Sequence, residues 1–136
     1  MGRYNNRRKT MLSWAVMKDG RALWTTNAVP RRAVYGESLR SFSGTEFRRW
    51  DPSRSKLGAA IMRTRRDPSW LLPEEGTDVL YLGAGHGTSI SHLHDYLCGQ
   101  HNDLKGRLVA VDLAPRSLKD QTQVAKNIPG LGTDLG

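Results

Sequence analysis

One stretch, residues 77–89, constrains the fold more than any other part of this 136-residue chain. Residues 79–82 form a short apolar run without polar alternation, which predicts a strand buried on both faces of a parallel sheet. The run ends in Gly83-Ala84-Gly85-His86-Gly87, and Thr88 then begins a segment with apolar residues at helical spacing. A strand, a glycine turn and a helix in this order begin a nucleotide-binding α/β domain, because the turn lets a ligand approach bare peptide groups.

The spacing of the glycines narrows the class of ligand. A dinucleotide site has the pattern G-x-G-x-x-G, whereas here the third glycine is Gly87 and position 88 is Thr88. The pattern G-x-G-x-G after a strand is typical of S-adenosylmethionine-dependent methyltransferases. A tight turn without a ligand remains the alternative.

Cysteine content and hydropathy indicate the compartment. Cys98 is the only cysteine, so no internal disulfide can form, and the chain is expected to be a reduced intracellular protein. No apolar run approaches the ~20 residues of a membrane span, and the basic start lacks the apolar core of a signal peptide. We therefore expect a cytoplasmic protein.

The positive charge is concentrated in the first half of the chain. Residues 1–70 hold sixteen Lys and Arg against five Asp and Glu, whereas residues 71–136 hold five against eight. A basic front half joined to a mildly acidic half favours a polyanion-binding surface beside a small-molecule domain, with RNA or DNA as the polyanion. A merely soluble basic surface is the alternative.

The chain divides into three expected parts: a basic disordered arm over residues 1–10, a small antiparallel β domain over 11–50, and a Rossmann-like domain over 51–136. In the β domain, Asp19-Gly20 predicts a hairpin turn, with Lys18 opposite Arg21 and Ala15 opposite Trp24. On this register Trp14 and Trp24 lie on opposite faces, one in the core and the other at the surface. Ser43-Gly44 predicts a second turn, between strands at residues 33–36 and 46–50.

In the Rossmann-like domain, Asp51-Pro52 predicts the start of a helix that continues to Arg66, with one buried stripe. A second buried strand at residues 107–112 ends in Asp112, a helix follows from Pro115, and a third strand is hinted at after Asn127. Asp112 is placed to accept hydrogen bonds from the ribose of an adenosine ligand, although a helix-capping role is the alternative. Thr88 and Ser89 offer hydroxyl and N–H groups to the carboxylate of the same ligand.

Three runs of this sequence closely resemble the fibrillarin family of RNA 2′-O-methyltransferases. They are Val34-Tyr35-Gly36-Glu37, the run from Glu46-Phe47-Arg48-Arg49-Trp50-Asp51 through Arg54-Ser55-Lys56-Leu57 to Ile61, and Val79-Leu80-Tyr81-Leu82-Gly83-Ala84. The resemblance extends from about residue 12 to the end. The archaeal form is the more similar, since no glycine–arginine-rich tract precedes the β domain.

The resemblance implies specific site residues. Lys56 matches the first lysine of the family's Lys-Asp-Lys active site. Gly83, Ala84 and Gly85 belong to the cofactor loop, where His86 replaces the family's usual serine. Positions that line S-adenosylmethionine in the family are matched by Thr88, Ser89, Asp112, Leu113 and Asp134. No metal site is expected, because His94 and Cys98 share a helix face but two ligands do not make a zinc site.

The function implied by the resemblance is S-adenosylmethionine-dependent 2′-O-methylation of ribose in rRNA or tRNA. The family's partners are a guide RNA, a Nop-type scaffold protein and a kink-turn-binding protein. The family's catalytic Asp, second lysine and closing strands would lie beyond residue 136, so this chain is expected to be a C-terminally truncated form that does not methylate RNA alone. A non-catalytic RNA-binding or assembly module of the same complex is the alternative.

Overall fold

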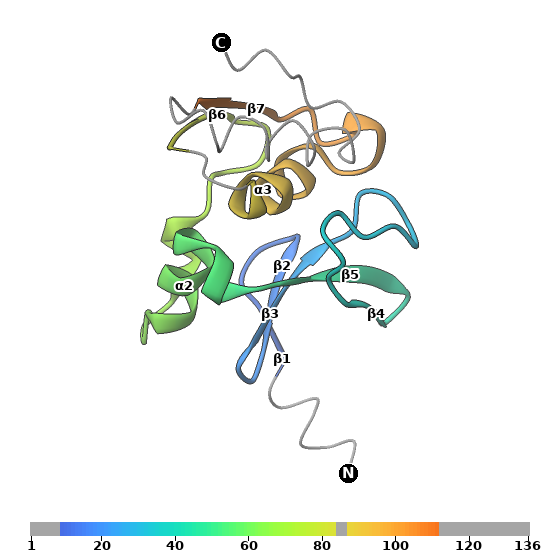
Figure 1. Ribbon diagram of the computed structural model, residues 1–136, viewed down its shortest axis with the longest axis vertical. Helices are drawn as coiled ribbons and strands as arrows, with labels where there is room; N and C mark the ends of the chain where they lie inside the picture. The colour runs from blue at the N-terminus through green and yellow to red at the C-terminus, as the bar shows by residue number, and fades with distance from the viewer. Residues whose placement is uncertain (1–8, 84–86, 112–136) are drawn as a thin grey trace.

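The structure is a computed structural model that describes residues 9–83 and 87–111. Three layers are visible in Figure 1: a two-stranded sheet, a central helix, and a five-stranded sheet. The α/β class expected from the sequence is confirmed. The division at residues 10 and 50 stays a prediction. The helix expected from Pro115 and the third strand after Asn127 fall outside the described residues.

The five-stranded sheet is antiparallel, with strand order β1-β2-β3-β5-β4. Its strands are β1 (Lys9–Met11), β2 (Val16–Asp19), β3 (Ala22–Thr26), β4 (Leu39–Phe42) and β5 (Thr45–Trp50). The first strand begins at Lys9, so Lys9 and Thr10 pair within the sheet although the sequence assigned them to the basic arm.

The first hairpin forms where the sequence predicts it, but its turn lies one residue later and the strand pairing is shifted by two residues. Asp19 pairs with Ala22, and Met17, not Ala15, lies opposite Trp24. The turn residues are Gly20 and Arg21, because Gly20 takes a left-handed φ of 60° at the first loop position, where this kind of turn favours glycine. The expectation that one tryptophan lies in the core and the other at the surface is confirmed, since Trp24 is 2% exposed and Trp14 is 39% exposed.

The second hairpin turns at Ser43-Gly44 as expected, but its first strand is β4 and not residues 33–36. The reason is the Glu37 carboxylate, which accepts hydrogen bonds from the backbone N–H groups of Val34 and Tyr35, both at 2.9 Å to Oε1. These bonds curl the segment around Glu37, and a curled segment cannot pair as a strand.

The predicted helix 52–66 is interrupted near its start. Asp51 caps a 3₁₀ turn, η1 (Pro52–Arg54), and Ser55 then caps the α-helix α2 (Lys56–Arg63) by accepting a 3.0 Å bond from the Gly58 N–H. Ser55 itself is extended, with φ −147° and ψ 117°, so the two helical pieces cannot be continuous. A further 3₁₀ turn, η2 (Pro68–Leu71), leads toward the parallel sheet.

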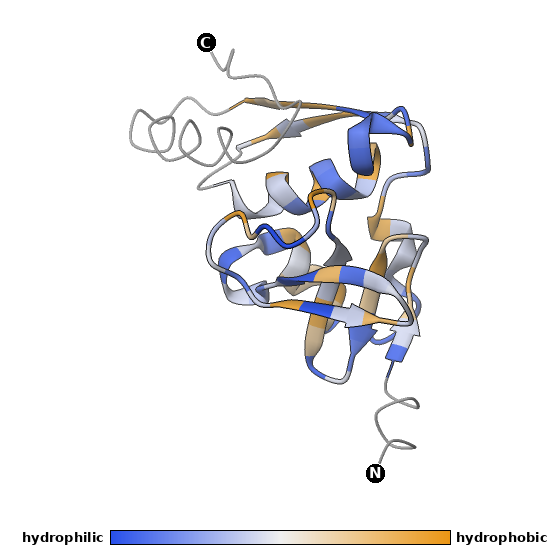
Figure 2. Ribbon diagram, turned by 90° about the vertical axis from the view of Figure 1, so that its right-hand side faces the viewer, coloured by the Kyte–Doolittle hydropathy of each residue, from blue (hydrophilic) through white to orange (hydrophobic). Residues whose placement is uncertain are grey.

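The parallel sheet consists of β6 (Asp78–Leu82) and β7 (Arg107–Val111), joined through α3 (Thr88–Cys98) and the 3₁₀ turn η3 (Gln100–Asn102). The prediction that residues 79–82 are buried on both faces is wrong for the described structure. Leu80 and Leu82 are 61% and 71% exposed, whereas Tyr81 packs with Ile90 of α3. In Figure 2 this sheet is coloured largely as apolar residues, while α3 beside it alternates polar and apolar.

The core follows from the position of α3 between the two sheets. All eleven residues of α3 are buried. Its apolar side chains share the main cluster with Val16 and Leu23 of the five-stranded sheet, Trp50 and Ile61. Within the described residues, no helix has the length and apolar character needed to cross a membrane.

Candidate active site

The glycine turn is built as the sequence predicts at both of its described ends. Gly83 follows β6 with φ 72°, and Gly87 caps α3 with φ 87°. These left-handed conformations are strained for residues with a Cβ atom, which accounts for glycine at both positions. Residues 84–86 lie outside the described residues, so the structure does not place Ala84 or Gly85.

The turn lies at the carboxyl edge of the parallel sheet. Leu82 pairs with Val111, and the Gly83 N–H donates to the Val111 carbonyl at 2.8 Å. Ligands of open α/β sheets bind at this edge. Asp112 follows Val111 in the sequence, but its side chain lies outside the described residues, as do Leu113 and Asp134.

The first turn of α3 provides backbone donors more readily than hydroxyls. Thr88 and Ser89 are both nearly buried, and the Ser89 hydroxyl is 2.5 Å from the Ser55 hydroxyl. Ser89 Oγ is therefore engaged inside the protein. The first N–H groups of an α-helix have no partner within the helix, so the N-terminus of α3 still presents donors beside the glycine turn.

Lys56 stands on the helix that this hydroxyl bond joins to α3. It is the first residue of α2, directly after Ser55, and its side chain is exposed. Trp50 packs beneath the same helix: a Cβ atom at Gly58 would lie only 2.9 Å from Trp50 Nε1. The start of α2 is thus joined to the start of α3 by one hydrogen bond and packs on β5 through one close ring contact. The structure brings Lys56 and Ser89 to adjoining helix ends.

Behind this site lies a buried ionic cluster that sequence reasoning missed. Arg48 is fully buried, pairs with the Glu37 carboxylate, and donates from Nε to Asp95 at 3.0 Å. Asp95 also accepts from the Ala28 N–H at 3.0 Å. Arg48 and Trp50 are two positions apart in β5, so their side chains lie on the same face of the sheet. The alternation of β5 could therefore have indicated that Arg48 faces α3.

His92 occupies the centre of the interface between α3 and the five-stranded sheet. Its ring stacks on Trp50 with the centroids 4.9 Å apart, and its nitrogens lie 2.7 Å from Thr25 Oγ1 and 2.6 Å from the Tyr35 hydroxyl. Burial, together with repulsion from Arg48, holds the pKa of His92 well below 6.5.

The neutral tautomer of His92 follows from counting protons. The Tyr35 hydroxyl donates its single proton to the Arg49 carbonyl at 3.0 Å, so it accepts from His92 Nε2–H. His92 Nδ1 then accepts from Thr25 Oγ1. Burial and the nearby Glu37 carboxylate raise the pKa of Tyr35 to about 12, which keeps this donor protonated.

The basic surface expected around α2 is only partly assembled. The basic front half of the chain brings seven basic residues to this helix and its entrance, and a polyanion-binding surface there would use Arg48, Arg49, Arg54, Lys56, Arg63, Arg65 and Arg66. Arg48 cannot face a polyanion because it is buried between two carboxylates, so that part of the expectation is wrong. Arg54, Arg63, Arg65 and Arg66 are exposed, and Arg49 is half-buried.

No group of three or more His, Cys, Asp or Glu side chains suited to a metal ion occurs within residues 9–83 and 87–111. Burial raises the pKa of the Cys98 thiol. The described part of the site therefore offers backbone N–H groups, one exposed ammonium group and arginine side chains.

Comparison with protein families agrees with this architecture. The family model described as Fibrillarin matches residues 5–131. A fibrillarin-like rRNA/tRNA 2′-O-methyltransferase of Methanosarcina barkeri is 40% identical over 124 residues, covering 89% of this chain and 50% of that protein. The protein of the same name in Saccharolobus solfataricus is 39% identical over 110 residues, covering 80% and 44%. The chain thus spans about half the length of these curated relatives.

Solved structures show the same similarity. Aeropyrum pernix fibrillarin, crystallised with natively bound S-adenosyl-L-methionine, superposes with a TM-score of 0.63 at 35% identity, covering 83% of this chain and 47% of that one. A fibrillarin/Nop5p complex gives a TM-score of 0.55 at 31% identity, covering 78% and 43%.

Proposed function

The chain belongs to the fibrillarin family, and from that membership we propose that it serves in the S-adenosylmethionine-dependent methylation of ribose 2′-hydroxyls in rRNA or tRNA. The names of its relatives support this reaction and these substrates. We propose further that it acts as the catalytic subunit of a guide-RNA ribonucleoprotein. A Nop-type scaffold is supported by the fibrillarin/Nop5p complex among the similar structures, and the guide RNA and a kink-turn-binding protein follow from the family.

The cofactor site that we propose lies at the carboxyl edge of the β6–β7 sheet. The glycines at both ends of the turn have left-handed backbone conformations, and α3 begins there with N–H groups that have no partner within the helix. These features fit an anionic carboxylate and a ribose. S-adenosylmethionine, when bound, supplies a methyl group on a sulfonium. The residues proposed to hold it are Gly83, Ala84, Gly85, Thr88, Ser89, Asp112, Leu113 and Asp134, with Ser89 contributing its backbone and not its engaged hydroxyl.

Lys56 is the proposed catalytic residue in this chain. A ribose 2′-hydroxyl is a weak nucleophile, and its oxygen gains negative charge as its proton leaves. An ammonium group near that oxygen stabilises the developing charge. Lys56 is suited to this role because its side chain is exposed while its helix is capped by Ser55.

The observation that carries the proposal is the 2.5 Å contact between Ser55 Oγ and Ser89 Oγ. It joins the residue before the proposed catalytic lysine to the helix that follows the glycine turn. A cofactor at the turn and a ribose at Lys56 would therefore meet across one fixed helix–helix contact.

The test is a methyl-transfer assay with guide RNA, substrate RNA and scaffold protein. We expect the 136-residue polypeptide by itself to give no turnover, because the resemblance assigns no residue in it to the family's general base. The same polypeptide, extended with the remaining half of the Methanosarcina barkeri relative, should methylate, and Lys56→Met should abolish that activity. RNA binding without turnover by the extended form would instead favour the non-catalytic assembly module.

A further inference from the structure

A small pocket opens beside η1, immediately before the helix that carries Lys56. Its volume is about 340 Å³, and its walls are residues 35–38 on one side and Arg49, Asp51 and Arg54 on the other. Arg54 and Lys56 are two positions apart in the sequence, so their Cα atoms lie within ~7 Å of each other. The pocket therefore adjoins the proposed catalytic lysine.

This pocket offers more hydrogen-bond donors than acceptors. Of its two carboxylates, Glu37 bonds Arg48 and two backbone N–H groups, and Asp51 accepts from the N–H and hydroxyl of Ser53, both on Oδ1, at 2.9 and 2.7 Å. These bonds to Ser53 are also the main reason that the pKa of Asp51 is lowered, so Asp51 stays ionised.

Neither arginine of the pocket makes a hydrogen bond or an ion pair through its guanidinium with a described residue, although the charges of both help to lower the pKa of Asp51. The Arg49 guanidinium lies 5.8 Å from the Trp24 ring, and its buried Nε is out of reach of a ligand. The exposed Arg54 guanidinium lies 5.0 Å from the centre of the Tyr35 ring and makes no ion pair with a described carboxylate. Arg54 therefore has hydrogen-bond donors available to a ligand.

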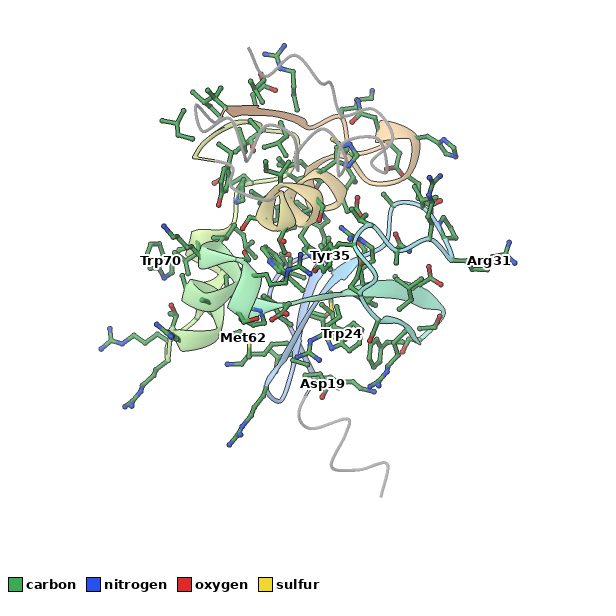
Figure 3. All side chains as sticks on the ribbon, in the orientation of Figure 1. Asp19, Trp24, Arg31, Tyr35, Met62 and Trp70 are labelled. Atoms are coloured by element: carbon green, nitrogen blue, oxygen red, sulfur yellow. The ribbon has the colours of Figure 1, made fainter. Side chains whose placement is uncertain are left out.

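The ring beneath Arg54 is itself fixed in place. The Tyr35 hydroxyl is bonded to both the Arg49 carbonyl and His92, and Figure 3 shows Tyr35 between α3 and the five-stranded sheet. A guanidinium stacked on a fixed aromatic ring has a restricted orientation, which lowers the entropy lost when it binds a planar or tetrahedral anion.

We infer that this pocket is a phosphate subsite, in which Arg54 holds a phosphodiester group of the RNA strand whose ribose lies at Lys56. A phosphodiester carries negative charge and only accepts hydrogen bonds, so it complements an exposed guanidinium group that has donors available. The subsite rests on the proposed function, because RNA is the substrate proposed there. It adds to that proposal a particular place where the strand is held.

The test is the binding of a fluorescently labelled single-stranded RNA to the 136-residue chain over a series of salt concentrations. Arg54→Gln should weaken binding about three- to tenfold at low salt and reduce the slope of log affinity against log salt by about 0.7, the value for one phosphate contact. Arg54→Lys should keep the slope but not the full affinity, because lysine retains the charge and loses the bidentate geometry.

The matched control is Arg31→Gln, which removes the same charge from an exposed loop far from Tyr35 in Figure 3. It should leave the affinity and the salt slope nearly unchanged. Competition with inorganic phosphate distinguishes a pocket that binds any phosphate from a pocket that binds only a phosphate of the RNA strand. Inorganic phosphate should displace RNA more readily from the wild type than from Arg54→Gln.

Equal effects of Arg54→Gln and Arg31→Gln would overturn the subsite while leaving the proposed methylation untouched, since cofactor binding is measured separately. Absence of RNA binding by the wild-type chain would overturn it as well. Arg54-dependent binding of an acidic peptide, with RNA binding unaffected by the substitution, would assign the pocket to a protein partner and also contradict the proposal.

Discussion

The two sides of α3 are buried in different ways. Toward the five-stranded sheet, the helix presents His92 and Asp95, which are bonded to Thr25, Tyr35 and Arg48, beside apolar side chains of the main cluster. Toward β6 and β7, it presents Ile90, which packs against apolar side chains. Buried hydrogen bonds and ion pairs therefore accompany apolar packing on the first side, whereas the second side is apolar.

This difference shows that the contacts that fix the position of α3 need not be the contacts that stabilise it most. Apolar contacts are non-directional, so the β6–β7 side stabilises the helix without fixing its rotation strongly. Hydrogen bonds of the other side require particular donors at particular places. That side also carries Trp50, which supports α2 and hence the start of Lys56's helix. We expect the polar side to determine where the site residues lie.

The largest expected effect comes from breaking the buried ionic cluster. Arg48→Ala leaves Glu37 and Asp95 without their cation in a buried position, and should lower the free energy of unfolding by about 3–5 kcal/mol. Urea denaturation followed by tryptophan fluorescence measures this. Arg31→Ala, at an exposed position, is the control. A loss below about 1 kcal/mol would show that the cluster is not desolvated as described.

A second effect concerns the contact between α2 and Trp50. Gly58→Ala places a methyl group 2.9 Å from Trp50 Nε1, so it should destabilise the fold by about 1–3 kcal/mol despite the higher helix propensity of alanine. Combining it with Trp50→Phe should be less than additive, because the smaller ring makes room for the methyl group. Additive losses in a double-mutant cycle would argue against this contact.

A smaller effect is expected from pH. The pKa of His92 is well below 6.5 in the folded protein, so below pH 6.5 the unfolded chain binds a proton that the folded chain does not. Stability should therefore fall as the pH drops, by about 1 kcal/mol between pH 6.5 and 5.5. His92→Gln should remove this slope in denaturation curves recorded at both pH values. A slope that persists in the variant would assign the titration to another group.

The smallest effect should come from the exposed apolar face of the parallel sheet. Leu80 is 61% exposed, so Leu80→Ser should change the free energy of unfolding by no more than about 0.5 kcal/mol. Leu97→Ala, on the buried side of the same region, should cost about 2–5 kcal/mol. Thermal melts of the two variants give the comparison. A loss above 2 kcal/mol for Leu80→Ser would mean that another element covers this face.

Local turn chemistry made part of the fold predictable from the sequence. Glycine at 83 and 87 marked the turn between β6 and α3, and Ser43-Gly44 marked the second hairpin, since the backbone at these positions requires residues that tolerate positive φ. The helix expected from Thr88 to near Cys98 is confirmed as α3.

Contacts between residues far apart in the sequence determine the parts of the fold that the sequence did not predict. Residues 33–36 have the composition of a strand but curl around the Glu37 carboxylate, which Arg48 holds from β5. The helix after Asp51 is broken because Ser55 is a second cap bonded to Ser89. Both outcomes depend on partners at least eleven positions away, beyond the range of a local pattern.

The candidate site was predictable where its residues belong to a motif. Lys56 came from the resemblance, and Thr88 and Ser89 came both from their place after the glycine turn and from the resemblance. The hydrogen bond between the Ser89 and Ser55 hydroxyls joins residues far apart in the sequence and was not predictable. The cluster around Arg48 was missed because a charged side chain in an arginine-rich segment is usually solvated. The one sequence feature that indicates burial of Arg48 is its place on the same face of β5 as Trp50.

A cofactor site at the glycine turn is tested by calorimetric titration of S-adenosylmethionine into the 136-residue chain and its Asp112→Ala variant. We expect the wild type to bind, and the variant to lose about 1–3 kcal/mol of binding free energy, the scale of hydrogen bonds to a charged group. Asp103→Ala, at an exposed position in the same half of the chain, should bind as the wild type does. Equal affinities for the wild type and Asp112→Ala, or no binding at all, would contradict a cofactor site at the glycine turn.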